Sequence, residues 1–276
     1  MNIIHKYICP FLITTLLLNS CTDVIDVNVP NGGARLVVEA FINWEKGTTG
    51  QNQVIKLSTS TAFFDSNPDI PAIGADVKVT NDNDGTEFIF QDQGNGRYIT
   101  NDFIPELNQI YLLEIIYNGK TYSATETLIP VVDISEVEQS ISEEDGDENI
   151  KVTIFFDDPA NEANYYLGEF IPSFNSQIDF FPLSDNFTDG NQNFMEFSDA
   201  DFIAGNTLSI SLYGISEHYY NFFDLLLIQS ESDGNGPFQT TPVQLKGNCK
   251  NLADPNEEVL GYFRLSEVVR TTYTIN

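Results

Sequence analysis

Residues 110–128 read IYLLEIIYNGKTYSATETL, a stretch in which two strand-like runs flank the pair Asn118-Gly119. A two-residue hairpin turn needs positive φ at both central positions, and Asn and Gly tolerate that conformation best. The stretch therefore predicts a β-hairpin between Ile110–Tyr117 and Lys120–Leu128. Its first strand places alternate side chains on one face: Tyr111, Leu113, Ile115 and Tyr117.

Similar short runs precede this hairpin and are separated by turn residues, including Gly-containing turns at 83–85 and 93–96. Seven short strands within residues 31–132 are typical of an immunoglobulin-like or transthyretin-like β-sandwich. We expect that fold for this region. The expected strands are Arg35–Asn43, Gln53–Thr59, Ala75–Thr80, Thr86–Gln91, Arg97–Thr100, Ile110–Tyr117 and Lys120–Leu128.

A second β domain is expected over residues 133–276, because Ile129-Pro130 and the acidic run Glu143–Glu148 interrupt the strand pattern. It carries the one helix that the periodicity predicts, at about 217–230, where Ser216 suits the N-cap. The apolar residues that follow at helical spacing are Tyr219, Tyr220, Phe223, Leu226 and Leu227. The expected strands are Asn149–Phe156, Asn164–Ile171, Thr207–Tyr213, Pro242–Lys246, Val259–Leu265 and Val269–Ile275. The whole chain is thus predicted to be mainly β.

Phenylalanines crowd the segment 172–206, which has no clear strand or helix period. A long segment of this kind in a compact domain is usually functional or mobile. Exposed rings amid Asn and Asp could stack on sugars or bury in a partner protein, whereas the alternative is that they pack in the core. The side chains proposed for contact with a partner or ligand are Phe180, Phe181, Phe187 and Phe194.

The N-terminal residues indicate a bacterial lipoprotein signal. Lys6 supplies a positive charge, an apolar run follows, and Leu18-Asn19-Ser20-Cys21 places a small residue before a cysteine. The apolar run is too short for a membrane-spanning helix. We expect residues 1–20 to be removed, Cys21 to be lipidated, and residues 21–30 to tether the folded part to a membrane. The alternative is an apolar N-terminus that precedes a cysteine by chance.

The composition bounds the classes of partner. The chain has 41 acidic and 12 basic residues, a net charge of −29 at pH 7, which repels nucleic acid phosphates and excludes nucleic-acid binding. Its 21 Phe and 12 Tyr distinguish it from a disordered acidic tail. Beyond the lipidated residue only Cys249 remains, so no internal disulfide can form.

Catalytic and metal chemistry have little support in the sequence. His218 is the only histidine beyond the signal, and Ser216, two residues away, would not face it on a helix. One His and the distant Cys249 make a poor zinc site. Calcium stays open, because Asp82–Gly85 imitates part of a calcium loop and Glu143–Glu148 could collect a cation, although a turn and a solvated loop account for them better. We therefore expect no enzyme and no metal site or cofactor, with calcium as the one alternative left open.

Several stretches spread over the chain resemble one family in their order and spacing. They are Leu36–Glu39, Gly74–Val77, Asp158-Pro159 with Asn164–Tyr166, Ser216–Phe223, Gly236–Phe238 and Val259–Phe263. The chain resembles a family of Bacteroidota lipoproteins, domain of unknown function four-two-four-nine. Many members carry paired cysteines near the C-terminus, which this chain lacks, so nothing that depends on them is carried over. The resemblance implies an outer-membrane lipoprotein, often encoded beside a TonB-dependent receptor, and no known catalytic residue.

From the lipid anchor, the expected sandwich and the resemblance, we expect a non-enzymatic accessory or binding subunit of a TonB-dependent nutrient-uptake system in the outer membrane. The alternative is a structural or adhesive cell-surface lipoprotein, and a hydrolase is a third hypothesis. Whether the protein faces the periplasm or the cell surface stays open. No residue pattern identifies its cargo.

Overall fold

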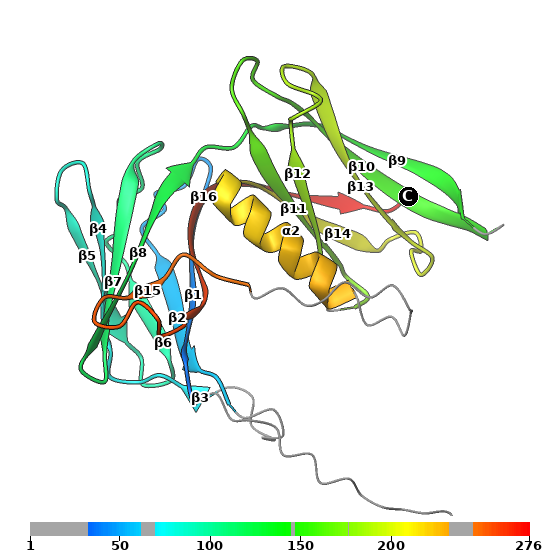
Figure 1. Cartoon of the computed structure of the whole chain (residues 1–276). Helices are drawn as coiled ribbons and strands as arrows, with labels where there is room; N and C mark the ends of the chain where they lie inside the picture. The colour runs from blue at the N-terminus through cyan, green and yellow to red at the C-terminus, as the bar shows by residue number, and fades with distance from the viewer. Residues whose placement is uncertain (1–32, 62–69, 145–146, 176, 232–244) are drawn as a thin grey trace, which may run out of the picture. The chain divides into compact units, whose positions relative to one another are not determined.

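The predicted hairpin is present in the computed structural model, which describes residues 33–61, 70–144, 147–175, 177–231 and 245–276 (Figure 1). Strands β7 (Ile110–Tyr117) and β8 (Lys120–Ile129) are paired antiparallel, and the last pair, Tyr117 with Lys120, flanks the turn. Asn118 and Gly119 have φ of 49° and 73°, the positive values that a type I′ turn needs. Tyr111, Leu113 and Ile115 are buried on one face, as the alternation predicts.

All seven strands predicted for the first part are present, with ends shifted by two residues at most. They are β1 (Leu36–Glu45), β2 (Gln53–Thr59), β4 (Asp76–Asn81), β5 (Glu87–Asp92), β6 (Arg97–Thr100), β7 and β8. A two-residue strand, β3 (Ile70–Pro71), was not predicted and pairs with β2. The chain is mainly β, as expected.

The second part differs more from the prediction. Its elements are β9 (Ile134–Glu144), β10 (Asp147–Asp157), β11 (Tyr165–Pro172), β12 (Asp179–Ser184), β13 (Gln192–Asp199), β14 (Thr207–Gly214), α2 (Glu217–Glu231), β15 (Lys250–Asn251) and β16 (Leu260–Thr274). The prediction missed β9, β12, β13 and the two-residue β15, and it divided β16 into two strands. For the expected strand Pro242–Lys246, residues 242–244 lie outside the described residues, and 245 and 246 are not in a strand.

The helix confirms the sequence signals for its start. Ser216 is the N-cap, because its Oγ accepts a hydrogen bond from the Tyr219 backbone N–H at 3.2 Å. Tyr219 is buried, and Phe223 lies against Phe180 of β12 with ring centroids 5.2 Å apart. Figure 1 shows α2 lying across β11 and β12. The amphipathic helix thus covers one face of that sheet.

The opposite face of the same sheet packs against a separate three-stranded sheet, β13-β10-β9. Strands β11 and β14 therefore bury both faces: Leu167 and Tyr213 face the helix cluster, whereas Phe170 and Leu212 belong to the cluster that includes Val152 of β10. This double burial explains why β14 reads as an almost continuous buried run rather than an alternating one.

The large sheet runs in the order β12-β11-β14-β16-β1-β2-β6-β5-β4-β7-β8-β15. Strand β16 also pairs in parallel with β8, through Leu265↔Leu128 and Ser266↔Ile129. The strands from β16 through β1 to β8 thus return to β16 and enclose a core that includes Val38, Leu113 and Phe263.

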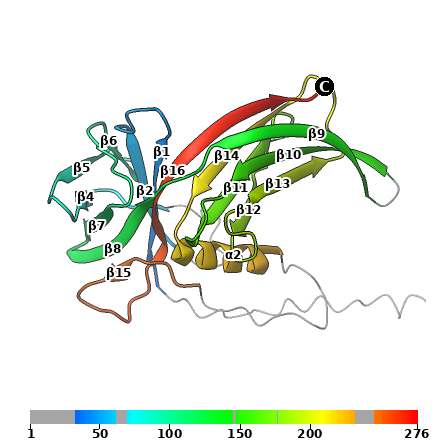
Figure 2. The ribbon, with the colours of Figure 1, turned by 90° about the horizontal axis from the view of Figure 1, so that it is seen from above.

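Strand β16 belongs to both parts of the chain. Its residues up to Val268 pair in parallel with β1, and from Val268 onward they pair antiparallel with β14. Figure 2 shows this long curved strand, in red, running from beside β1 to beside β14. A domain boundary between residues 132 and 133 would place the paired strands β1 and β16 in different domains. The expected division into two domains stays a prediction.

A buried cation lies where these elements meet. Arg264 of β16 is 5% exposed, and its guanidinium lies over the rings of Phe41, Tyr213 and Tyr219, at 5.2, 4.8 and 4.9 Å from their centroids. It also donates a hydrogen bond of 2.8 Å to Oδ1 of Asn43. The three rings come from β1, β14 and α2, so one side chain joins four elements.

We predict that Arg264→Ala lowers the free energy of unfolding by at least about 2 kcal/mol, because a desolvated cation–π contact alone is worth about that much. Arg97→Ala is the matched control, since Arg97 is exposed and should cost less than about 0.5 kcal/mol. Urea denaturation of both variants measures the difference. Equal small losses would show that the ring contacts contribute nothing.

Candidate functional site

The four predicted contact phenylalanines lie in different surroundings. Phe180 of β12 is partly buried and packs on the helix through Phe223. Its neighbour Phe181 is on the opposite face, 36% exposed, with its ring edge-to-face on Phe170 at 5.3 Å. Phe180 therefore has a packing role, and Phe181 has a partial one.

Phe187 and Phe194 are the two that remain available to a partner. Phe187, in the loop between β12 and β13, is 100% exposed. Phe194 of β13 is 54% exposed and is 6.3 Å from the ring of Phe155. Other rings of the segment, such as Phe197 and Phe202, pack in the second core. A contact role for the four predicted residues stays a prediction.

A pocket of about 660 Å³ opens where β8, the start of α2, the segment 246–252 and β16 come together. Its wall includes Glu126, Ser216, His218 and Tyr262, together with Lys246 and Lys250. The volume is typical of small-molecule sites, and polar groups from four separate segments converge on it. We treat this pocket as the candidate binding site.

Glu126 organises the pocket. Its Oε2 accepts hydrogen bonds from Ser216 Oγ at 3.0 Å and from the Tyr262 hydroxyl at 3.3 Å, and its Oε1 accepts one from the Thr127 backbone N–H at 3.0 Å. One carboxylate on β8 thus holds the start of α2 and the start of β16. Burial raises the pKa of Glu126, although these three hydrogen bonds and the charge of His218 offset part of the effect.

Ser216 and His218 both line the pocket, but they differ in their surroundings. His218 is exposed, whereas Ser216 Oγ donates to Glu126 and accepts from Tyr219 as the helix cap. Within the described residues no hydrogen bond joins Ser216 and His218, as expected for residues two apart on a helix. Sequence reasoning missed Glu126 and Tyr262, which are 136 residues apart and carry no local signal.

Cys249 is buried, and burial raises its pKa to about 12. A cysteine acts as a nucleophile in its thiolate form, so this side chain stays an unreactive thiol near neutral pH. It packs in the first core with Val259 and Phe263.

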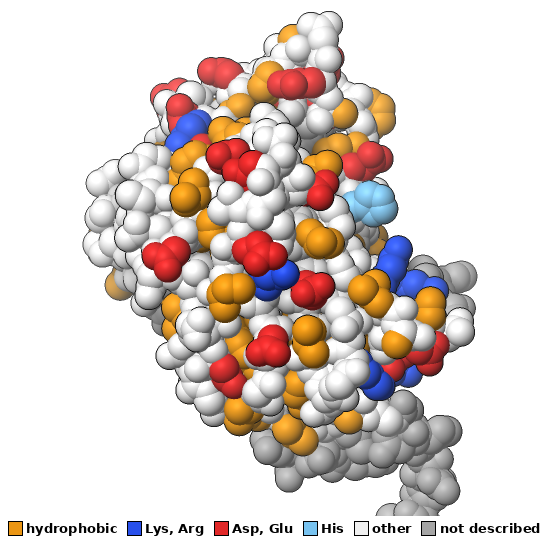
Figure 3. All heavy atoms as spheres, turned by 90° about the vertical axis from the view of Figure 1, so that its left-hand side faces the viewer, with side chains coloured by type: hydrophobic (Ala, Val, Ile, Leu, Met, Phe, Trp, Pro, Cys, Tyr) orange, Lys and Arg blue, Asp and Glu red, His pale blue; other side chains and the backbone are white. Residues whose placement is uncertain are grey.

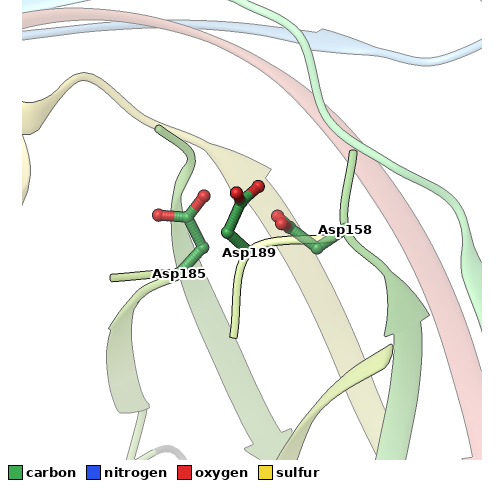
Figure 4. A group of neighbouring side chains, drawn as sticks. All are labelled: Asp158, Asp185 and Asp189. Atoms are coloured by element: carbon green, nitrogen blue, oxygen red, sulfur yellow. The ribbon is translucent and has the colours of Figure 1, made fainter. Parts of the chain in front are cut away.

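Three carboxylates that the sequence did not suggest as metal ligands gather in the second part: Asp158, Asp185 and Asp189 (Figure 4). One oxygen from each lies within 4.8 Å of the others, a donor set of the kind that hard cations such as Ca²⁺ accept. Asp158 and Asp185 are buried, whereas Asp189 is exposed. Among the described residues this is the group that could hold a metal ion.

Most of these oxygens already accept hydrogen bonds from the protein. Asp158 accepts from the Tyr166 hydroxyl at 2.7 Å and from the Gly190 N–H at 3.0 Å. The other two accept from backbone N–H groups, Asn164 to Asp185 at 2.9 Å and Asn161 to Asp189 at 2.8 Å. The trio therefore joins the loop after β10 to the loop after β12.

Of the two segments considered for calcium, Asp82–Gly85 forms the turn between β4 and β5. In this turn Asp84 accepts a hydrogen bond of 2.8 Å from the Thr86 N–H. That bond lowers the pKa of Asp84 and uses its carboxylate within the turn. Within the other segment, Glu143–Glu148, residues 145 and 146 lie outside the described residues.

Cys21 and the expected signal at 1–20 also lie outside the described residues, as does the tether at 21–30. The described helix α2 is not both long and apolar enough to span a membrane.

We predict that Glu126→Gln gains stability relative to the wild type as the pH rises. Because the folded-state pKa of Glu126 lies above 4.5, its contribution to stability is fully present below about pH 4.5 and is lost as pH rises through the folded pKa. Gln has no such titration. Urea denaturation of both proteins at about pH 5 and pH 8 measures the change, and a pH-independent difference would contradict it.

Asp158→Asn should lower the free energy of unfolding by about 1–3 kcal/mol, because an amide N–H₂ would face one of the two donors that the buried carboxylate now accepts. The exposed Asp189→Asn is the matched control and should change stability by less than about 0.5 kcal/mol. Thermal and urea denaturation compare the two. Similar losses for both would argue against this role of Asp158.

The solved structures that match this chain have low sequence identity to it and low TM-scores. A two fibronectin type-III domain segment from chicken tenascin is 12% identical, with 58% of this chain and 83% of that one covered and a TM-score of 0.21. The chicken interferon gamma receptor alpha chain is 12% identical, with 66% and 89% covered and a TM-score of 0.20. The FN1–FN3 domains of chicken CNTN1 are 13% identical, with 67% and 60% covered and a TM-score of 0.22. At these TM-scores the likeness supports no argument about fold or function.

No curated protein matches the chain in sequence. A family model described as Domain of unknown function (DUF4249) matches residues 22–272, which include the pocket, the aspartate trio and the exposed phenylalanines. This match confirms the family to which the sequence stretches pointed, domain of unknown function four-two-four-nine, and no more than that. The chain belongs to the DUF4249 family of proteins.

Proposed function

We propose that the protein is a lipid-anchored outer-membrane lipoprotein that serves as a non-enzymatic binding or accessory subunit of a TonB-dependent nutrient-uptake system. The lipoprotein signal that ends at Cys21 supports the anchor. The resemblance of the sequence to Bacteroidota lipoproteins supports the association with a TonB-dependent receptor. In this proposal Cys21 carries the lipid and the folded part contacts the receptor.

The complete exposure of the Phe187 ring is the observation that carries the partner contact. A large aromatic side chain gains most when it is buried in a partner, and aromatic residues are enriched among the anchors of protein interfaces. Phe194, which is 54% exposed, could contribute a second ring.

The proposal also includes the fold of the two parts of the chain, residues 31–132 and 133–276. An immunoglobulin-like or transthyretin-like sandwich over residues 31–132 would suit a binding module, and strands β1, β2 and β4 to β8 contribute to one shared core. A second β domain over 133–276 would then present the loop that contains Phe187.

The test is affinity purification of the full-length protein from native outer membranes, with the partners identified by mass spectrometry. We predict that a TonB-dependent receptor is recovered with the wild type and falls at least tenfold with Phe187→Ala/Phe194→Ala. Neither ring has a buried packing role, so the fold should persist, which circular dichroism checks.

The matched control is Ile89→Ala/Ile104→Ala, which truncates two exposed apolar side chains, 50% and 59% exposed, in the first part of the chain. It should leave receptor recovery unchanged. Equal recovery with the phenylalanine variant would refute the contact, whereas wild type that recovers no receptor would refute the accessory function and favour the adhesive alternative.

A further inference from the structure

Most basic side chains of the described residues pair with a carboxylate. This is expected, because the chain has 41 acidic residues and only 12 basic ones. Ion pairs of this kind include Lys46 with Asp133, Lys120 with Glu257 and Lys151 with Glu196. A lysine that stays without a carboxylate in such a chain therefore stands out.

Lys246 and Lys250 are two such lysines, and both line the 660 Å³ pocket. Within the part of the chain that the structure describes, neither has a carboxylate oxygen within 4.0 Å, and both are exposed. Figure 3 shows Lys and Arg side chains gathered near the pale blue histidine, whereas elsewhere on that face they are sparse among acidic ones. The two lysines therefore supply the unpaired positive charge of the pocket lining, while the carboxylates of Glu126 and Glu217 belong to other parts of its wall.

The segment that carries the two lysines is held in place. Asn248, between them, donates from Nδ2 to the Phe263 carbonyl at 2.7 Å and accepts at Oδ1 from the Phe263 N–H at 2.9 Å. Gly247 lies so close to β16 that a Cβ there would be 1.8 Å from the Gly261 carbonyl oxygen. The lysine backbone is therefore fixed before any ligand arrives, which reduces the entropic cost of binding.

Another wall of the pocket offers different chemistry. Glu126 accepts one hydrogen bond at Oε1, from Thr127, so this oxygen keeps a lone pair for a further donor. Ser123 and Thr125 of β8 also line the pocket with hydroxyl-bearing side chains. A carboxylate wall repels an anionic group but accepts hydrogen bonds from ligand hydroxyls.

We propose that this pocket binds a small polyhydroxylated anion, with its carboxylate or phosphate held by Lys246 and Lys250 and its hydroxyl groups facing Glu126. A sugar acid or a sugar phosphate has this chemistry and fits a pocket of about 660 Å³. Large polyanions are disfavoured, because the net charge of −29 repels them beyond the pocket. Binding of such an anion does not require a receptor.

The same lysines border a second cavity, of about 690 Å³, whose additional cation Arg35 is already paired with Glu258. That pairing leaves less positive charge for a ligand there. The pocket with Glu126 therefore suits the proposed ligand better.

The experiment is isothermal titration of the purified full-length protein with glucuronate, glucose 6-phosphate and glucose as separate probes. At least one of the two anions should bind at least tenfold more tightly than neutral glucose, and the better one shows whether carboxylate or phosphate is preferred. Affinity should fall at least tenfold with Lys246→Gln/Lys250→Gln and should weaken with added salt.

The control Lys56→Gln/Arg97→Gln removes two positive charges on β2 and β6, neither of which lines the pocket, and should leave the affinity unchanged. All four positions are exposed or partly exposed, so the variants should fold. Failure of both anions to bind, equal binding of glucose, or full affinity in the Lys246/Lys250 variant would each overturn the proposal.

Discussion

The described structure depends on β16 changing partners while it carries a buried cation. The strand pairs in parallel with β1 and then antiparallel with β14, and Arg264 lies just before the change. Removing a guanidinium from water is costly unless other groups compensate. Three aromatic rings and the Asn43 side chain provide that compensation here. Arg suits this position because its planar group stacks on rings and is more weakly hydrated than an ammonium group.

The candidate pocket follows from the same arrangement. Strand β16 brings Tyr262 to Glu126, and the start of α2, which Tyr219 fixes against Arg264, brings Ser216 to the same carboxylate. Asn248 ties the lysine-bearing segment to Phe263 of β16 through both of its amide atoms. The polar groups of the pocket are therefore positioned by rigid elements rather than by a free loop. Such preorganisation is what a selective small-molecule site requires.

Local patterns predicted the first part of the chain well, because its strands alternate strictly and its turns carry Asn and Gly. They failed for β13, where Phe194 points outward and Phe197 inward, so that aromatic residues on both faces conceal the alternation. They failed for β9 because its register shifts opposite Phe155 and Phe156. Ile134 and Val137, three residues apart in the sequence, therefore both pack against the second core, and the two-residue alternation is broken.

The candidate site was harder to predict, because it depends on pairings between distant residues. The two strands expected within β16 leave out residues 266–268, yet Glu267 is buried inside the continuous strand and accepts a hydrogen bond from the Val131 N–H at 2.9 Å. The parallel pairing of β1 with β16 joins the two ends of the described chain and leaves no local signal. The helix cap Ser216 was identified, whereas its partner Glu126, 90 residues away, was not.

The most direct test of the central claim, that β16 makes the two parts depend on each other, is urea unfolding followed by two local probes. Fluorescence of Trp44, the one tryptophan, reports on the first core, against which it packs. Hydrogen-exchange mass spectrometry of β10 and β13 peptides reports on the second. If β16 couples the parts, both probes should give the same midpoint. Two separate midpoints, with β10 and β13 opening while Trp44 stays folded, would contradict the account.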